Sequence, residues 1–285
     1  MTVAAIYRTP ESAAALRRRY RELLAGWPVP HTEDWVATHL GGTFVVASGP
    51  TEAPPVILLH GSGANSAMWR EDAAAWSTTM RVYAVDIPGE PGLSVAARPP
   101  LDSDAYVRWL TEVLDGLSVD RASLVGISLG GWLATRFAVR RADRVNRLVL
   151  LSPSGIGRQK TGTLLVALAL LPFGRRGRQL AMRKVLGAQL SGTAAGEYVL
   201  LIHKHFRPRT ERVPILTDIE LARIAAPTLV VVGQNDTLLN SAETTQRMEQ
   251  HAPHATVILV PDAGHLLPTQ TDRVHAFLTD TTSGP

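Results

Sequence analysis

The sequence contains no cysteine, which excludes disulfide bonds, thiolate metal sites and cysteine nucleophiles. It also lacks a long apolar run, because the longest, residues 163–173, falls far short of the ~20 residues that cross a bilayer. The first residues have no basic start, and Arg8 and Glu11 interrupt the apolar residues that a signal peptide would need. We therefore expect a cytoplasmic protein without stable membrane insertion.

Charge is unevenly distributed along the chain. The 285 residues suffice for one large α/β domain with an insertion, or for two small domains. The net charge is +4, but residues 154–214 contain eleven Lys or Arg and only two acids, so this segment carries +9 and the remainder −5. The basic segment could favour substrates that carry a carboxylate, or it could be a solvated helical face. We expect no nucleic-acid partner.

Short apolar runs alternate with amphipathic stretches over most of the chain. The predicted strands are residues 42–47, 56–59, 82–86, 123–126, 148–151, 228–232 and 256–260. The predicted helices between them include residues 69–78, 105–117 and 129–139. Short apolar strands separated by helices indicate a mostly parallel sheet that is covered on both faces. The sequence therefore predicts the α/β class.

The predicted core consists of residues 1–153 and 215–285. Within it, we expect residues 1–40 to form an N-terminal helical extension that packs on the sheet. Thr9 and Pro10 are typical of a helix start, an N-cap followed by proline at the first helical position. Apolar residues then recur at helical spacing as far as Pro28, which ends the pattern.

Residues 154–214 interrupt the alternation of strands and helices. They contain no buried strand-like run, but they include three helix-like stretches, residues 164–171, 178–186 and 194–205. An insertion at this point would emerge at the carboxyl edge of the sheet. We predict that it forms a helical cap whose apolar residues contact either the core or the substrate channel; these residues are Leu164, Leu165, Leu168, Leu171 and Phe173.

The strongest chemical motif is Gly126-Ile127-Ser128-Leu129-Gly130, a G-x-S-x-G sequence between an apolar strand and an apolar helix. A sharp turn of this kind exposes the serine oxygen above the sheet, and small neighbours let the backbones approach each other. The following helix points its N-terminus at the place where negative charge develops. Ser128 is the predicted nucleophile, and the N–H of Leu129 is a predicted oxyanion donor.

The nucleophile needs a general base that an acid holds in place. His265 lies on a loop after the predicted strand 256–260, and Asp236 follows the predicted strand 228–232. Both side chains should therefore reach the same sheet edge as Ser128. Asp262 is the rival acid, but its closeness to His265 in the sequence is more typical of a turn residue.

A glycine-rich loop, His60-Gly61-Ser62-Gly63, follows the predicted strand 56–59. Its glycines permit a backbone with inward-facing amides, so the N–H of Ser62 is the second predicted oxyanion donor. We interpret the His60 ring as a hydrogen-bonded tie within the loop rather than as a catalytic group. The predicted pocket residues, with core packing as the alternative for the two tryptophans, are Gly61, Gly63, Trp69, Trp132 and Leu266.

Together these motifs resemble the α/β-hydrolase superfamily, and within it the bacterial carboxylesterase-like proteins with a helical cap. The resemblance runs from Pro54 to the end of the chain and rests on residues 59–63, 86–94, 126–131, 233–236 and 264–265. Nucleophile, acid and base also occur in the family's order along the chain. The resemblance implies hydrolysis of a small ester-like molecule through an acyl-enzyme, without metal or organic cofactor. The serine argues against the dehalogenase and epoxide hydrolase branches, which use aspartate.

One stretch departs from the family pattern. Residues 86–94 are similar to the usual Asp-x-Pro-Gly-x-Gly-x-Ser turn, but Glu90-Pro91 adds a residue. Because this turn is structural in the family, we expect the extra residue to change the shape of the loop and not the chemistry.

Several alternatives remain open at the level of sequence. The same triad could act on a C–C bond, a thioester or an amide, or in a lyase, because fold and motif do not separate these reactions. The chain could instead be a non-catalytic binding protein with a hydrolase fold. It could also be a membrane-surface protein that uses residues 163–184 as an interfacial helix, although Pro172 argues against one long helix. A monomer and a homodimer are equally consistent with the sequence.

Overall fold

A central sheet of eight strands organises the molecule. The computed structural model describes residues 6–160, 174, 177 and 193–280. The strand order is β1-β2-β4-β3-β5-β6-β7-β8. The strands are β1 (His31–Thr38), β2 (Gly41–Ser48), β3 (Pro55–Leu59), β4 (Arg81–Val85), β5 (Ala122–Ile127), β6 (Val145–Leu151), β7 (Thr228–Gly233) and β8 (Thr256–Val260). Only β2 pairs antiparallel with its neighbours β1 and β4, so the predicted mostly parallel sheet is confirmed.

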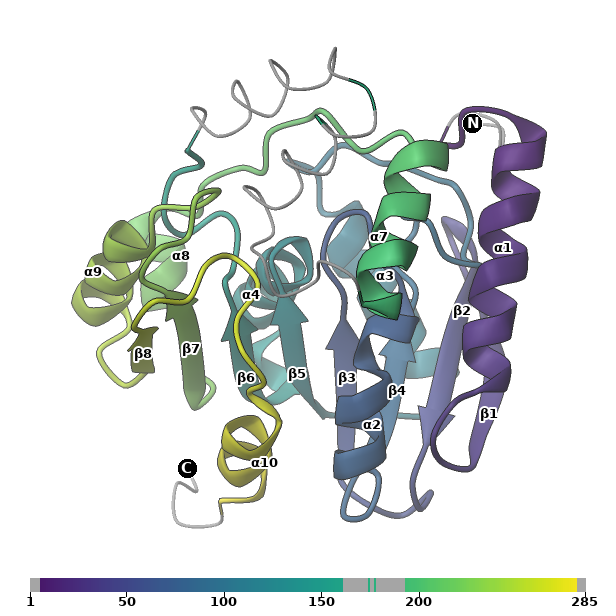
Figure 1. Cartoon of the computed structure of the whole chain (residues 1–285). Coiled ribbons are helices and arrows are strands. Elements are labelled where there is room, and N and C mark those ends of the chain that lie inside the picture. Colours follow the sequence, from purple (N-terminus) through teal and green to yellow (C-terminus); the bar gives the residue numbers. More distant parts are fainter. Residues whose placement is uncertain (1–5, 161–173, 175–176, 178–192, 281–285) are drawn as a thin grey trace.

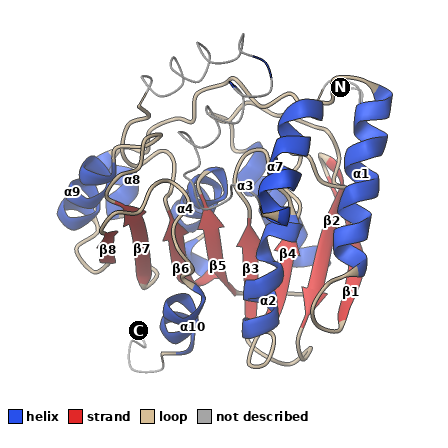
Figure 2. Cartoon of the chain, in the orientation of Figure 1, coloured by secondary structure: helices blue, strands red, loops and turns tan. Residues whose placement is uncertain are grey.

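Helices cover both faces of this sheet (Figures 1 and 2). The described helices are α1 (Pro10–Ala25), α2 (Arg70–Trp76), α3 (Ala105–Gly116), α4 (Leu129–Arg140), α7 (Ala194–His205), α8 (Asp218–Ala222), α9 (Ser241–His251) and α10 (Thr271–Thr279), with 3-10 turns η2 (Ser66–Trp69) and η3 (Ala142–Arg144). Core residues of α3, α4, α8 and α9 pack on one face, and those of α1, α2 and α10 on the other. No described helix is both long enough and apolar enough to cross a membrane.

Burial on both faces of the sheet explains why the sequence of strand β3 is apolar without interruption. Ile57 and Leu59 belong to the core on the α3–α4 face, whereas Val56 and Leu58 belong to the core on the α1–α2 face. All four side chains are fully buried. Because side chains alternate between the two faces of a strand, a sheet covered on both faces needs apolar residues at every position.

The prediction that residues 1–40 form a helical extension is wrong in its second half. The helix α1 starts as expected, with the Thr9 hydroxyl accepting the N–H of Ser12 at 3.1 Å. However, His31–Thr38 is the edge strand β1, which pairs antiparallel with β2 along its length. Only Val36 in this strand is buried, so β1 lacks the apolar run by which the other strands are predicted.

The predicted cap is described only at its two ends, residues 154–160 and 193–214, and at 174 and 177. The predicted helix at 194–205 is confirmed as α7. The predicted helices at 164–171 and 178–186 lie outside the described residues, as do the five apolar cap residues named above. The helix α7 packs beside α1, and its Tyr198 hydroxyl accepts a hydrogen bond from Asn65 Nδ2 at 2.7 Å (Figure 1). The described end of the insertion therefore contacts the loop after β3.

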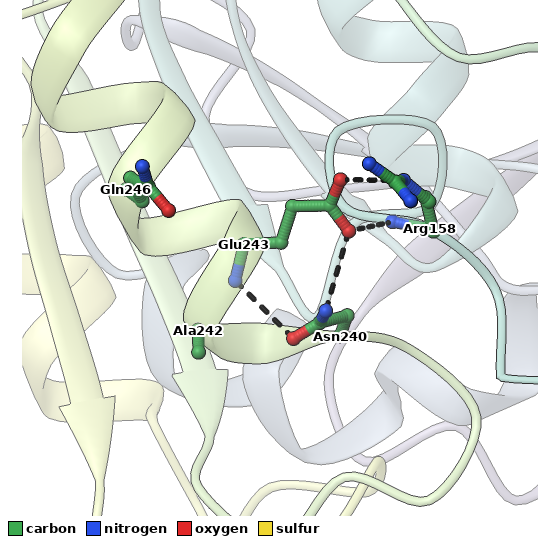
Figure 3. Close-up of a pocket in the computed structure, with 5 residues that line it drawn as sticks. All are labelled: Arg158, Asn240, Ala242, Glu243 and Gln246. Atoms are coloured by element: carbon green, nitrogen blue, oxygen red, sulfur yellow. Dashed lines mark hydrogen bonds and ion pairs between the residues drawn. The ribbon is translucent and has the colours of Figure 1, made fainter.

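The start of the insertion forms hydrogen bonds and an ion pair with the first residues of α9 and the segment before it. Gln159 and Leu239 form an antiparallel bridge, and the N–H of Asn240 donates to the Arg158 carbonyl at 3.0 Å. The Arg158 guanidinium pairs with Glu243 at 2.9 Å (Figure 3). Arg158, Asn240 and Glu243 line a surface hollow, but its charged groups already bind one another. We therefore assign this cluster a structural role.

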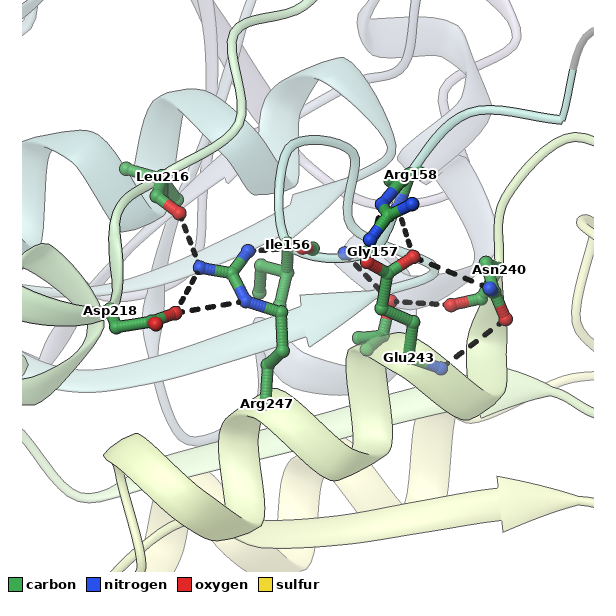
Figure 4. Close-up of polar contacts among 9 residues, drawn as sticks. Ile156, Gly157, Arg158, Leu216, Asp218, Asn240, Glu243 and Arg247 are labelled. Atoms are coloured by element: carbon green, nitrogen blue, oxygen red, sulfur yellow. Dashed lines mark hydrogen bonds and ion pairs between the residues drawn. The ribbon is translucent and has the colours of Figure 1, made fainter.

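Arg247 of α9 joins both ends of the insertion (Figure 4). Its Nη1 donates to the Ile156 carbonyl at 2.5 Å, just where the insertion begins. Its Nη2 donates to the Leu216 carbonyl and to Asp218 Oδ1, each at 2.6 Å, just where the chain returns to the core. One largely buried side chain thus fixes the two segments relative to each other.

We expect Arg247→Ala to lower the free energy of unfolding by about 2–4 kcal/mol. Two backbone carbonyls would lose a charged donor, and such hydrogen bonds contribute ~1.5–3 kcal/mol each, less where solvent reaches them. Urea unfolding measures the change. The matched control is Gln246→Ala, an exposed neighbour on the same helix, which should stay within about 0.5 kcal/mol of wild type. Equal effects of the two substitutions would contradict the role assigned to Arg247.

Candidate active site

The turn that carries the predicted nucleophile, Ser128, joins β5 to α4 at the carboxyl edge of the sheet. Ser128 has a left-handed backbone conformation, with φ +53° and ψ −111°. A Cβ atom on Gly126 would lie 2.3 Å from the Gly130 carbonyl oxygen, and one on Gly130 would lie 2.1 Å from that of Leu59. Strand, turn and helix therefore approach so closely that both flanking positions require glycine. This packing holds the Ser128 side chain above the sheet, where it is partly exposed.

The structure brings the predicted base and acid to Ser128 in one line. The Nε2 atom of His265 lies 3.2 Å from Ser128 Oγ. The Nδ1 atom of the same ring lies 2.8 Å from Asp236 Oδ2. When Nδ1–H donates to the carboxylate, Nε2 is left free to accept the serine proton. His265 and Asp236 are both buried, at 6% and 2% exposure, which strengthens their interaction.

Asp236 is held as a carboxylate by its surroundings. Its Oδ1 accepts the N–H groups of Leu238 at 2.7 Å and Leu239 at 3.0 Å. Burial alone would raise the pKa of Asp236, but the hydrogen bond and charge of His265, together with these two N–H groups, lower it. Lys160, at the start of the insertion, donates from Nζ to the Asp236 carbonyl at 2.7 Å. The insertion therefore supports the loop that carries the acid.

The rival acid, Asp262, does not contact the base. It is exposed and has φ +56°, as a residue of a tight turn does. The loop that carries Asp236 packs closely on the loop that carries His265. A Cβ atom on Gly233 would lie only 2.2 Å from the Gly264 carbonyl oxygen, so there is no room for a side chain between the two loops. The structure thus places Asp236, and not Asp262, beside the imidazole.

The glycine-rich loop after β3 lies next to the nucleophile. A Cβ on Gly61 would be 3.5 Å from the Cβ of Ser128. Within the described part of the chain, the N–H groups of Ser62 and Leu129 have no hydrogen-bond acceptor. Two free backbone donors beside a nucleophile can stabilise an oxyanion. Their role as the oxyanion hole remains a prediction.

The His60 ring ties this loop to the loop after β4. Its Nε2 accepts the N–H of Ile87 at 2.9 Å, so the ring proton sits on Nδ1 and is donated to the Gly61 carbonyl at 2.8 Å. Burial lowers the pKa of His60, which keeps the ring neutral. With both nitrogens occupied, His60 positions Gly61 and takes no part in proton transfer.

The structure places the two predicted pocket tryptophans in the core. Trp69 is 2% exposed and packs against Trp76 on the α1–α2 face. Trp132 is fully buried on the opposite face, and its Nε1 donates to the Pro214 carbonyl at 3.0 Å. Neither ring has surface left for a substrate, so the pocket assignment is corrected to core packing for both. Leu266 is half-buried directly after the base, and its pocket role stays a prediction.

A second serine, Ser154, lies next to Ser128 and was not predicted from the sequence. Ser154 Oγ lies 3.4 Å from Ser128 Oγ, and its N–H donates to the Ser128 carbonyl at 3.0 Å. A useful signal was present, because Ser154 follows the apolar strand β6 and so had to reach the same sheet edge. The oxygen–oxygen distance is long for a hydroxyl hydrogen bond. Ser154 therefore supports the turn more through its backbone than through its side chain.

The described residues offer no cluster of three or more His, Asp or Glu side chains placed to hold a metal ion. The groups that the structure brings together are the Ser128 hydroxyl, the His265 imidazole, the Asp236 carboxylate and the backbone amides of Ser62 and Leu129. Such a set can carry out nucleophilic acyl transfer.

Comparison with known proteins gives matches over most of the chain. A model of the alpha/beta hydrolase family matches residues 56–278, a range that contains every site residue described above. Carboxylesterase YbfK of Bacillus subtilis is 31% identical over 265 residues, 90% of this chain and 89% of the relative. The crystal structure of that carboxylesterase superposes with a TM-score of 0.83, covering 94% of this chain and 99% of the other. A pimeloyl-[acyl-carrier protein] methyl ester esterase of Nitrosospira multiformis is 29% identical over 239 residues, 75% of this chain and 89% of the relative.

Proposed function

The chain belongs to the alpha/beta hydrolase family, and we propose that it is a carboxylesterase that works through an acyl-enzyme on Ser128. One observation carries the proposal: Ser128 Oγ, the His265 ring and the Asp236 carboxylate form a continuous hydrogen-bonded line at the carboxyl edge of the sheet. The names of the relatives, a carboxylesterase and a methyl ester esterase, support an ester as the bond that is cleaved.

In the first half-reaction, Ser128 Oγ attacks the ester carbonyl while His265 Nε2 takes the hydroxyl proton. The carbonyl oxygen becomes an oxyanion, which the N–H groups of Ser62 and Leu129 stabilise. The Asp236 carboxylate stabilises the imidazolium through Nδ1–H. When the tetrahedral intermediate collapses, the C–O bond to the alcohol breaks and His265 returns its proton to the leaving oxygen.

In the second half-reaction, water takes the place of the alcohol. His265 removes a proton from the water molecule, whose oxygen attacks the acyl carbon, and the same two N–H groups hold the second oxyanion. Collapse breaks the bond to Ser128 Oγ, which regains its proton from His265. The products are a carboxylic acid and an alcohol, and no cofactor is consumed.

We further propose that residues 154–214 form a cap over this site and select the substrate. The described ends support the idea, because α7 contacts the loop after β3 through Tyr198 and Lys160 contacts the loop of the triad acid. A cap at this position would exclude water from the acyl group.

A series of p-nitrophenyl esters of increasing acyl length is the direct test of the function. We expect turnover of at least one ester and stoichiometric labelling of Ser128 by a small fluorophosphonate, located by mass spectrometry. The panel includes a thioester, an anilide and an aromatic meta-cleavage product, so that faster cleavage of a C–S, C–N or C–C bond would replace the ester assignment. Absence of both labelling and turnover would favour the non-catalytic binding protein.

A further inference from the structure

Glu90, one of the two residues in the lengthened part of the turn after β4, is buried beside the 60–63 loop. Its side chain is 2% exposed, although a glutamate is rarely buried without a partner. Its Oε2 accepts the N–H of Gly63 at 2.6 Å, and the Ser62 hydroxyl lies 3.5 Å from the same oxygen. Glu90 thus contacts the loop that bears a predicted oxyanion donor.

The Gly63 hydrogen bond controls the backbone on which that donor sits. Gly63 has φ +68°, and a Cβ on this glycine would meet nothing within 4 Å, so packing does not fix its conformation. The carboxylate of Glu90 fixes the plane of the peptide between Ser62 and Gly63. The N–H of Ser62 belongs to the preceding peptide, which the φ and ψ angles of Ser62 join to that plane. Fixing one peptide plane therefore restricts the direction of the N–H in the other. A short charge-assisted hydrogen bond is suited to hold such a loop.

The groups around Glu90 do not compensate for the energetic cost of burying its carboxylate. No arginine or lysine in the described residues forms an ion pair with it within 4 Å. Two guanidinium groups attract the carboxylate from further away, those of Arg98 in the following loop and Arg209 after α7, and two phenols, Tyr7 and Tyr106, also face it. Burial outweighs these attractions and raises the pKa of Glu90 to about 7.

The raised pKa means that Glu90 destabilises the fold at high pH. The folded protein holds the proton up to about pH 7, whereas an unfolded glutamate loses it near its ordinary pKa of 4.5. The unfolded state therefore binds fewer protons between these two values, and stability falls as the pH rises through this window. A buried carboxyl that weakens the fold near neutral pH needs a reason other than stability.

We propose that Glu90 is a positioning residue for the oxyanion hole, whose ionised carboxylate holds the 60–63 loop so that the Ser62 N–H points at the developing oxyanion. This inference rests on the proposed esterase function. It assigns to Glu90 an effect on the rate of acyl transfer. Protonation of Glu90 weakens its hydrogen bond with the Gly63 N–H, so activity falls as the pH drops through about 7.

The test is Glu90→Gln, which keeps the shape of the side chain and removes the charge. We expect kcat to fall roughly 10-fold with KM within about twofold, because the weakened donor acts mainly in the transition state. The acid-side inflection near pH 7 in kcat/KM that we assign to Glu90 should disappear. The same variant should have a higher Tm than wild type at pH 8.

Glu112→Gln is the matched control. This glutamate of α3 also accepts a backbone N–H, from His39 at 2.7 Å, but it pairs with the edge of the sheet far from the nucleophile in the fold. It should leave kcat and the pH profile within about twofold of wild type. If Glu90→Gln does not fold, Glu90→Asp serves instead, and it should lower kcat while keeping the inflection, because a shorter carboxylate still ionises.

Two results would overturn the proposal: unchanged kcat and pH profile in Glu90→Gln, or a loss of activity that accompanies a lower Tm at pH 8. The second result would make Glu90 a structural residue only. Failure of the esterase function itself is separately visible, because wild-type protein would then neither hydrolyse the ester panel nor react with the fluorophosphonate.

Discussion

Replacing Ser128 by alanine is expected to lower kcat for ester hydrolysis by at least ~10⁴-fold while the protein stays folded. Without Oγ there is no nucleophile, and the remaining donors cannot form an acyl-enzyme. Alanine has the same Cβ as serine, so it adds no strain to the left-handed backbone at this position. Steady-state turnover of the best p-nitrophenyl ester and the thermal unfolding midpoint measure the two parts of this prediction.

The control for Ser128 is its neighbour Ser154. Their hydroxyl oxygens lie 3.4 Å apart, but the imidazole of His265 contacts only the oxygen of Ser128. Ser154→Ala should therefore reduce kcat by less than about 10-fold and leave fluorophosphonate labelling intact. Retention of more than a tenth of wild-type activity in Ser128→Ala would show that the nucleophile is elsewhere.

The second large effect is expected at the triad acid. Asp236→Asn should lower kcat by roughly 10³–10⁴-fold. The two N–H groups of Leu238 and Leu239 require an acceptor on the Oδ1 side, so the amide oxygen would stay there. The amide nitrogen must then replace Oδ2 and point its protons at His265 Nδ1. The ring would carry its proton on Nε2, where the base needs a free lone pair.

Asp262→Asn is the matched substitution on the neighbouring loop. Asp262 is exposed, and its positive φ suits asparagine as well as aspartate. We expect kcat within about twofold of wild type. The comparison uses one ester and one pH for both variants. If Asp262→Asn lost more activity than Asp236→Asn, the roles of the two carboxylates would have to be exchanged.

Glu90 and Ser128 are both energetically unfavourable residues that lie at or beside the candidate site. Ser128 holds an unfavourable backbone conformation, and Glu90 holds a buried carboxyl with a pKa raised to about 7. Each costs the fold some stability. Ser128 is the proposed nucleophile, and Glu90 contacts the loop of a proposed oxyanion donor. Functional sites commonly retain such local penalties because the surrounding core is stable enough to impose them.

Local patterns in the sequence determined the parallel strands, the nucleophile turn and the places of acid and base. An apolar run predicts a strand covered on both faces, and residues that directly follow the parallel strands of one sheet reach the same sheet edge. This is why Ser128, Asp236 and His265 could be grouped although 137 residues separate the first from the last.

Tertiary structure alone decided the features that depend on which segments meet. The edge strand β1 is polar and mostly exposed, so only its hydrogen bonds to β2 reveal it. The burial of Trp132 follows from its contact with Pro214, across the whole insertion. Glu90 reaches Gly63 from a different loop, a contact that no periodicity encodes. Hydrophobic periodicity records how each segment faces the core, whereas polar contacts between loops form only after the sheet has set their separation.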